Sequence, residues 1–218
     1  MKSKWDIARE NIGSINDVIE LIKEGPASTR GKRGKPYILD FGKQRRASIR
    51  GEGQIENQLL NVKQCILLKN GKELNFIRFL SNAFGIGGTR LGNVIVDLFG
   101  LDKKDSPVCG EVKITSGNPW SAVVQSVEQV ALLRSDRKYF LENIRGKFSQ
   151  PIRGTGAWGL VIAPRKYWNK KESESAKKLV EVLREKTKVR ICCTVYDEKA
   201  ITDQAILEVV YGLPPYAK

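Results

Sequence analysis

The sequence predicts an α/β domain in which helices flank a mixed central sheet, and three observations support this fold class. The chain has 218 residues, which is enough for one domain with a substantial core. Hydrophobic residues make up 41% of it, as is usual in globular proteins. Along the second half of the chain, strand patterns alternate with helix patterns, which is typical of α/β domains.

A basic helical arm is predicted ahead of this domain. Residues 14–24 carry apolar side chains at helical spacing, and Ser14 is a suitable N-cap. Residues 30–50 then interleave glycines with many cations, which is typical of a segment that binds DNA phosphates. These cations are Arg30, Lys32, Arg33, Lys35, Lys43, Arg45, Arg46 and Arg50. The alternative is a solvated linker. We therefore expect an arm over residues 1–50 and a core over residues 51–218.

The first part of the core has a less certain pattern. Residues 54–68 favour a helix, and Asn70-Gly71 indicates a turn. Residues 73–84 fit a strand and a helix equally well. The glycine-rich residues 85–92 indicate a loop, in which Arg90 is a candidate phosphate contact and a plain connector is the alternative.

The second part of the core has a clearer order. Residues 93–99 and 108–115 predict two paired strands with a polar turn between them. Asn118-Pro119 predicts the start of a helix over residues 120–133, because a capping residue precedes a first-turn proline. The remaining predicted elements are a strand over 158–163, a helix over 172–186, a strand over 189–196 and a helix over 200–210.

The composition of the chain narrows the classes of function that the protein can have. Thirty-eight Lys and Arg against 24 Asp and Glu give a net charge of +14, which favours a polyanionic partner, nucleic acid first. The absence of histidine excludes serine or cysteine hydrolases that use histidine, and histidine-ligated zinc. The four cysteines lack C-x-x-C spacing, and no long apolar run or signal-peptide pattern is present. We therefore expect a cytoplasmic protein with free thiols and no membrane association.

One group of residues predicts a catalytic site. Glu111 and Lys113 are two apart on a strand and share a face, and the hairpin can place Asp97 beside Glu111. Two carboxylates at one sheet edge suit Mg²⁺, and Lys113 would hold or deprotonate a water or hold a phosphate. The alternative is a solvated hairpin with cross-strand ion pairs. Four acid-x-Lys triplets occur, but only Glu111-Lys113 combines an apolar strand with an acid on the strand before it.

The order of elements around these residues resembles the PD-(D/E)XK nuclease superfamily, which includes restriction-type endonucleases. The resemblance spans about residues 54–163, and Val96 stands where many members have proline. It implies a restriction-endonuclease-like fold in which Asp97 and Glu111 bind Mg²⁺. It further implies that the Val112 carbonyl is another metal ligand and that Lys113 is the catalytic lysine.

The resemblance also implies supporting residues on two helices. Glu56, on the helix before the hairpin, would complete the site through metal-bound water. Many members place Gln or Tyr on the helix after the lysine strand, and Gln125 and Gln129 match that place. Their alternative role is that of ordinary surface or structural amides.

The expected activity is Mg²⁺-dependent hydrolysis of DNA, with Ser116 and Asn118 as further phosphate contacts and Asn118 also as a helix cap. A type II restriction enzyme is the first choice, because no helicase, ATPase or zinc module is present. Cutting both strands of double-stranded DNA calls for two sites, so we expect a homodimer. The alternatives are a junction-resolving or repair nuclease and a non-catalytic nucleic-acid-binding protein, and an RNA substrate stays open.

Overall fold

The computed structural model describes residues 12–24, 51–89, 92–114, 116–135, 156–197 and 201–217, and only the backbone of residues 82–89, 92, 93 and 135. The predicted basic arm over residues 30–50 and the predicted phosphate contact Arg90 lie outside the described residues.

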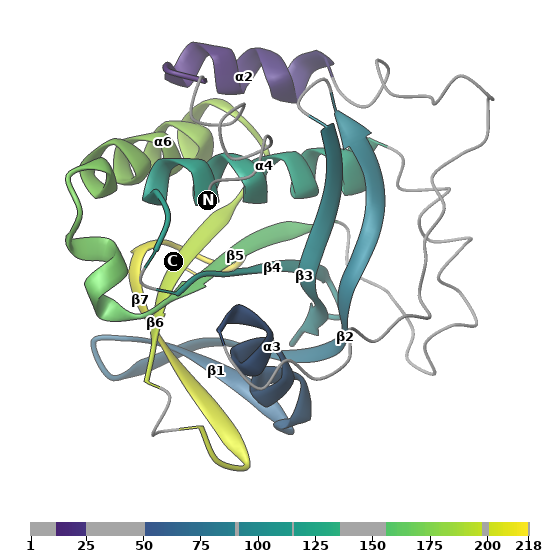
Figure 1. The fold of residues 1–218 in the computed structure, drawn as a ribbon, viewed down its shortest axis with the longest axis vertical. Coiled ribbons are helices and arrows are strands. Elements are labelled where there is room, and N and C mark those ends of the chain that lie inside the picture. The colour runs from purple at the N-terminus through teal and green to yellow at the C-terminus, as the bar shows by residue number, and fades with distance from the viewer. Residues whose placement is uncertain are drawn as a thin grey trace.

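Seven strands form a closed barrel in which each strand pairs with the next along the chain and the last pairs with the first (Figure 1). The strands are β1 (Gln64–Lys69), β2 (Lys72–Thr89), β3 (Gly92–Asp102), β4 (Pro107–Val112), β5 (Trp158–Ala163), β6 (Ile191–Tyr196) and β7 (Gln204–Gly212). The β4–β5, β5–β6 and β1–β7 pairs are parallel, and the other pairs are antiparallel.

The predicted fold, a restriction-endonuclease-like central sheet flanked by helices, is therefore wrong. The sheet closes because β1 and β7 pair in parallel, with Cys65 opposite Ala205 and Leu67 opposite Leu207. The sequence predicts helices over both of these segments, so those two predictions are also wrong. In β7, buried residues alternate with exposed or half-buried ones, which is the period of a strand with one face toward the core.

Helices cover the barrel on two sides. They are α2 (Ile15–Glu24), α3 (Glu52–Asn61), α4 (Pro119–Ser135) and α6 (Glu172–Lys186), with a short 3-10 helix, η2 (Arg165–Asn169). Figure 1 shows α2, α4 and α6 together on one side and α3 on the opposite side. The predicted helix starts are confirmed: the Ser14 hydroxyl accepts the Asp17 N–H at 3.2 Å, and Asn118 Oδ1 accepts the Trp120 N–H at 2.8 Å.

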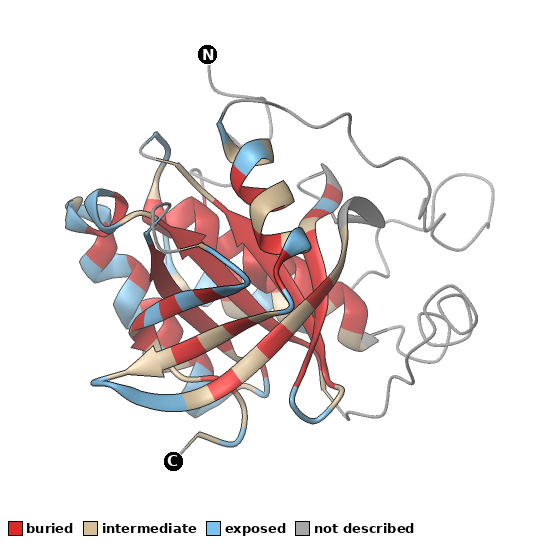
Figure 2. Cartoon of the chain, turned by 90° about the horizontal axis from the view of Figure 1, so that it is seen from below, coloured by how far each residue is buried: buried red, intermediate tan, exposed pale blue. Residues whose placement is uncertain are grey.

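Both faces of the central strands are buried, and each face belongs to a different apolar cluster. On β5, Trp158, Leu160 and Ile162 belong to the cluster that includes apolar residues of α3, whereas Val161 and Ala163 belong to the cluster that includes apolar residues of α2, α4 and α6. Figure 2 shows buried residues along these strands and exposed ones on the outer side of α6. A strand that is buried on both faces has a continuous apolar sequence, and this pattern made β5 predictable.

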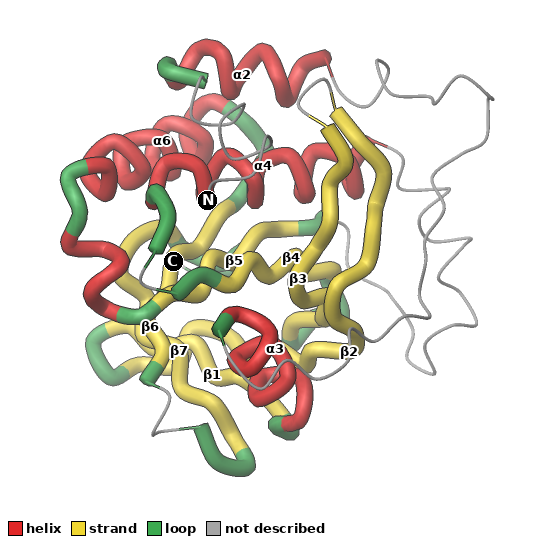
Figure 3. Tube along the Cα trace, in the orientation of Figure 1, coloured by secondary structure: helices red, strands yellow, loops and turns green. Residues whose placement is uncertain are grey.

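The strands β2 and β3 form a long, bent hairpin that rises from the barrel toward α4 (Figure 3). The predicted turn between β1 and β2 is confirmed, with positive φ at Asn70 (51°) and Gly71 (75°). The predicted loop over residues 85–92 is wrong, because β2 continues to Thr89 and β3 begins at Gly92. Two register shifts along β2 bend the hairpin. None of the helices among the described residues is both long and apolar enough to cross a membrane.

Candidate active site

Asp97 lies where the β3–β4 ladder ends. The last pair of this ladder joins Leu98 to Gly110, so the same antiparallel register would place Asp97 opposite Glu111. Instead of a further ladder bond, the Asp97 carboxylate accepts the Val112 N–H at 2.9 Å. The hairpin therefore brings together the two carboxylates on which the sequence prediction depended.

Glu111 is fully buried and is held from two sides. Lys113 Nζ lies 2.5 Å from its Oε1. The Gln129 amide, on α4, donates to its Oε2 at 2.7 Å and to the Ile95 carbonyl at 2.9 Å. The structure thus places the predicted residues Asp97, Glu111, Lys113 and Gln129 in one cluster, and α4 orients the carboxylate.

The charges in this cluster act on one another strongly. Burial, and then the charge of Asp97, raise the pKa of Glu111 to about 8, although Lys113 and Gln129 oppose the shift. Burial alone would lower the pKa of Lys113, but the charges of Glu111, Asp97 and Glu52 outweigh it, and the net pKa is raised. Lys113 therefore stays an ammonium that donates hydrogen bonds, and the alternative in which it deprotonates water loses support.

Glu52 is a nearby acid that the sequence prediction missed. It begins α3 one turn before Glu56, so the two glutamates share a helix face. Its charge acts on Lys113, whereas Glu56 is buried on α3 beside Ile55 and Leu59. The available signal was this i, i+4 spacing, and the proposed role of Glu56 stays a prediction.

The remaining predicted contacts occupy different positions. Gln125 is half-buried one turn before Gln129, Ser116 is exposed, and Asn118 is half-buried as the cap of α4. The Lys113 N–H donates to the Ile162 carbonyl on β5, and the Val112 N–H points to Asp97 on the other side. Because a strand residue directs its N–H and C=O to the same edge, the Val112 carbonyl also faces the Asp97 side.

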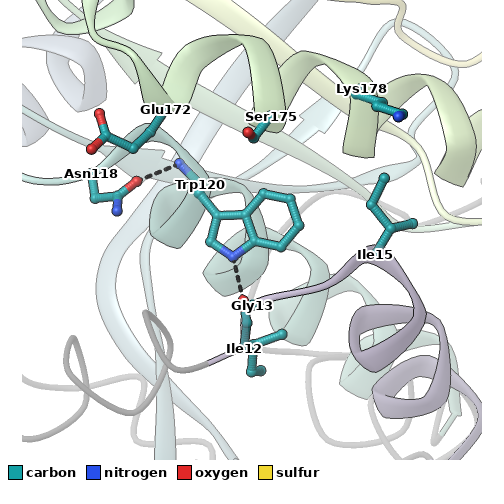
Figure 4. A pocket seen from close by; sticks show the side chains of 8 residues that line it. All are labelled: Ile12, Gly13, Ile15, Asn118, Trp120, Glu172, Ser175 and Lys178. Carbon is teal, nitrogen blue, oxygen red and sulfur yellow. Dashed lines mark hydrogen bonds between the residues drawn. The ribbon is translucent and has the colours of Figure 1, made fainter.

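A cavity of about 370 Å³ opens between α2, the start of α4 and α6 (Figure 4). Its lining includes the Trp120 ring, Glu172 and Lys178. The Trp120 indole N–H already donates to the Ile12 carbonyl at 2.6 Å. Asn118 is the residue that this cavity shares with the predicted site, and the cavity holds neither of the two clustered carboxylates.

The cluster suits a hard cation such as Mg²⁺. Two carboxylates supply charged oxygen ligands, and Gln129 Oε1 is a buried amide oxygen without a hydrogen-bond partner beside them. No group of three or more His, Cys, Asp or Glu able to hold a metal is found among the described residues. Mg²⁺ often binds through only two carboxylates and completes its shell with water and substrate phosphate.

The four cysteines are free and buried, and burial raises the pKa of Cys65 to about 12, so they make poor ligands or nucleophiles.

Comparisons with known proteins add no family: no family model, curated protein or solved structure matches this chain. The resemblance to the PD-(D/E)XK superfamily therefore rests on the sequence motif alone, and the closed barrel differs from the fold that this resemblance implied.

The raised pKa of Glu111 predicts how stability changes with pH. A carboxyl whose pKa is raised in the folded state binds its proton more tightly there than in the unfolded chain. The free energy of unfolding therefore falls as pH rises from about 4.5 to about 8. Mg²⁺ bound to the ionised carboxylates opposes this fall. We expect Mg²⁺ to raise the melting temperature more at pH 8 than at pH 5, and Glu111→Gln to remove that difference. Equal shifts at both pH values would contradict the metal assignment.

Proposed function

We propose that this protein hydrolyses phosphodiester bonds of double-stranded DNA with Mg²⁺. The observation that carries the proposal is the buried cluster in which Glu111, with its raised pKa, lies 2.5 Å from the Lys113 ammonium and next to Asp97. Strongly perturbed pKa values in a group of charged residues are common at functional sites.

An ordinary ion pair explains this cluster less well. A surface pair contributes little to stability, and a buried pair often contributes no more than apolar residues of the same volume. Here the Glu111 side chain is fully buried, the Lys113 side chain is 18% exposed, and Asp97 adds a second negative charge. An arrangement that costs stability is more readily explained by a function than by folding.

Each residue has a distinct role in the proposed reaction. Asp97, Glu111 and the Val112 carbonyl would hold Mg²⁺, which when bound supplies charge stabilisation for the phosphate and acidifies water. The Lys113 ammonium donates a hydrogen bond to the phosphate or to the attacking water, and stabilises the negative charge that develops. Gln129 fixes the Glu111 carboxylate through its contact with Oε2.

The net charge of the chain favours the proposed substrate, and the two strands of DNA favour the proposed dimer. A net charge of +14 favours a polyanion, and cleavage of both strands favours a homodimer with two sites. We propose a type II restriction activity first. A junction-resolving or repair nuclease is the second candidate within the same chemistry.

Incubation with supercoiled plasmid and Mg²⁺ tests the proposal. We expect wild type to cleave the plasmid, EDTA to stop cleavage, and Asp97→Asn to lose it. Glu181→Gln, an exposed acid on α6, is the matched control and should cleave like wild type. Discrete fragments would support restriction, and cutting of branched DNA alone would support a resolvase. DNA binding without cleavage under every metal condition would overturn the enzymatic proposal in favour of a binding protein.

A further inference from the structure

The carboxyl ends of β4 and β5 bring a second segment to the proposed site. The two strands are parallel, with Glu111 opposite Val161 and Val112 opposite Ile162. The segments that follow β4 and β5 therefore both start at the same end of the barrel. After β4 this is the segment from Lys113 to Gly117, and after β5 it is the segment that contains Tyr167 in η2.

Tyr167 packs directly against the segment that follows Lys113. A Cβ placed on Gly117 would lie 3.6 Å from both the Tyr167 hydroxyl oxygen and its ring, and Gly117 has a φ of +105°. Lys170 donates from Nζ to the Gly117 carbonyl at 2.6 Å, and the same ammonium lies 4.7 Å from the centre of the Tyr167 ring. Two residues of this second segment thus hold the chain four positions after Lys113.

The Tyr167 hydroxyl has no evident structural role. The side chain is fully buried, and its hydroxyl oxygen has no hydrogen-bond partner among the described residues. A buried polar atom without a partner is costly and therefore calls for an explanation. The electrostatic surroundings offer one, because the charges of both Lys113 and Glu111 act on this phenol. Burial, the largest effect, raises the pKa of Tyr167, so the phenol stays neutral and keeps an oxygen that accepts hydrogen bonds.

We propose that Tyr167 is a positioning residue of the site, whose phenol oxygen accepts a hydrogen bond from the Lys113 ammonium during the reaction. An ammonium has three N–H donors, and the ion pair with Glu111 Oε1 at 2.5 Å would engage one of them. A second acceptor from η2 would fix the direction of the third N–H, which is then aimed at the substrate. This inference rests on the proposed nuclease function.

Tyr167→Phe tests the inference, and Tyr211→Phe is its matched control. Both rings pack edge-on against Trp168, with centroid separations of 5.1 and 5.0 Å. The Tyr211 phenol lies near Cys193 rather than near Lys113. Both variants should fold, because the Tyr167 hydroxyl has no partner to leave unpaired, and the Tyr211 hydroxyl interacts only with the Cys193 thiol, a weak hydrogen-bonding group. We expect Tyr167→Phe to lower kcat about tenfold with KM unchanged. Tyr211→Phe should leave both kcat and KM at their wild-type values.

A double-mutant cycle separates positioning from a general structural effect. If Tyr167 acts through Lys113, single-turnover cleavage by Lys113→Ala should not fall further when Tyr167→Phe is added. Equal losses in both backgrounds would overturn the inference and leave the nuclease proposal intact. A wild type that does not cleave would overturn the nuclease proposal itself.

A measurement independent of cleavage covers the case in which Lys113→Ala is too slow to assay. Lysines labelled with 13C at Cε give NMR signals while their ammonium groups keep all three N–H donors, and the Lys113 signal is assigned by its loss in Lys113→Arg. We expect this signal to shift in Tyr167→Phe and to stay in place in Tyr211→Phe. A Lys113 signal with the same chemical shift in Tyr167→Phe as in wild type would overturn the inference.

Discussion

Lys113→Ala is expected to lower the single-turnover rate of plasmid cleavage about a thousandfold. The ammonium is the only positive charge that the structure places in contact with the Glu111 carboxylate among the described residues, and its raised pKa keeps it charged at every working pH. Alanine removes both the charge and the donor. The effect should appear in kcat, because Lys113 is proposed to act on charge that develops in the transition state.

Two further variants identify the cause of this loss. Lys177→Ala removes an exposed lysine on α6 and should cleave at the wild-type rate, which controls for the change in net charge. Lys113→Arg keeps the positive charge but replaces a compact ammonium by a planar guanidinium, so we expect an intermediate rate. A Lys113→Ala protein that cleaves as fast as wild type would remove Lys113 from the mechanism.

The sequence predicted individual elements better than it predicted their assembly. The starts of α2 and α4 were predictable because Ser14 and Asn118 are local caps whose hydrogen bonds depend only on nearby residues. The two elements that were predicted as helices instead of strands are β1 and β7, which pair with each other. Closure of the barrel depends on this long-range pairing, so two local errors changed the whole fold class.

The physical reasons for these two errors differ. The sequence of β1, QCILLK, contains a continuous apolar run of only four residues, and such a run fits a buried strand and the end of a helix equally well. In β7, Ala205, Leu207 and Val209 are buried at period 2, but Ala, Leu and Glu are also strong helix formers. Tertiary pairing overrode the local propensity in that segment.

The site shows the same division between local and long-range information. Glu111 and Lys113 were found from strand periodicity, and Asp97 from its place on the preceding strand of a hairpin. Gln129 came from the family resemblance; it donates a hydrogen bond to Glu111, and its supporting role stays a prediction. Tyr167 had no local signal, because it reaches Gly117 only through the parallel pairing of β4 and β5, whose sequences lie far apart.

The position of α4 on the barrel leads to the second large expected effect, which is on stability. At Gly159 on β5, α4 lies directly against the sheet. A Cβ at this position would overlap Ser126 Oγ and lie 2.6 Å from Ile191 Cδ1 and 3.2 Å from Val130 Cγ2. We expect Gly159→Ala to lower the free energy of unfolding by about 1–3 kcal/mol, because overpacking of this kind requires the side chains of Ser126 and Ile191, and with them α4, to shift. The lower entropy of the unfolded alanine chain offsets only about 0.4–1 kcal/mol of this.

Gly156→Ala is the matched control three residues earlier, where the nearest atom to an added Cβ is Arg134 Nη2 at 3.4 Å. It should be neutral or slightly stabilising, so chemical denaturation of the two variants isolates the steric effect. Because α4 carries Gln129, a displaced helix also loosens the hold on Glu111. Gly159→Ala should therefore cleave DNA more slowly even at temperatures where it remains folded, whereas Gly156→Ala should not. Equal stability of the two variants would mean that α4 does not pack on β5 as closely as the structure places it.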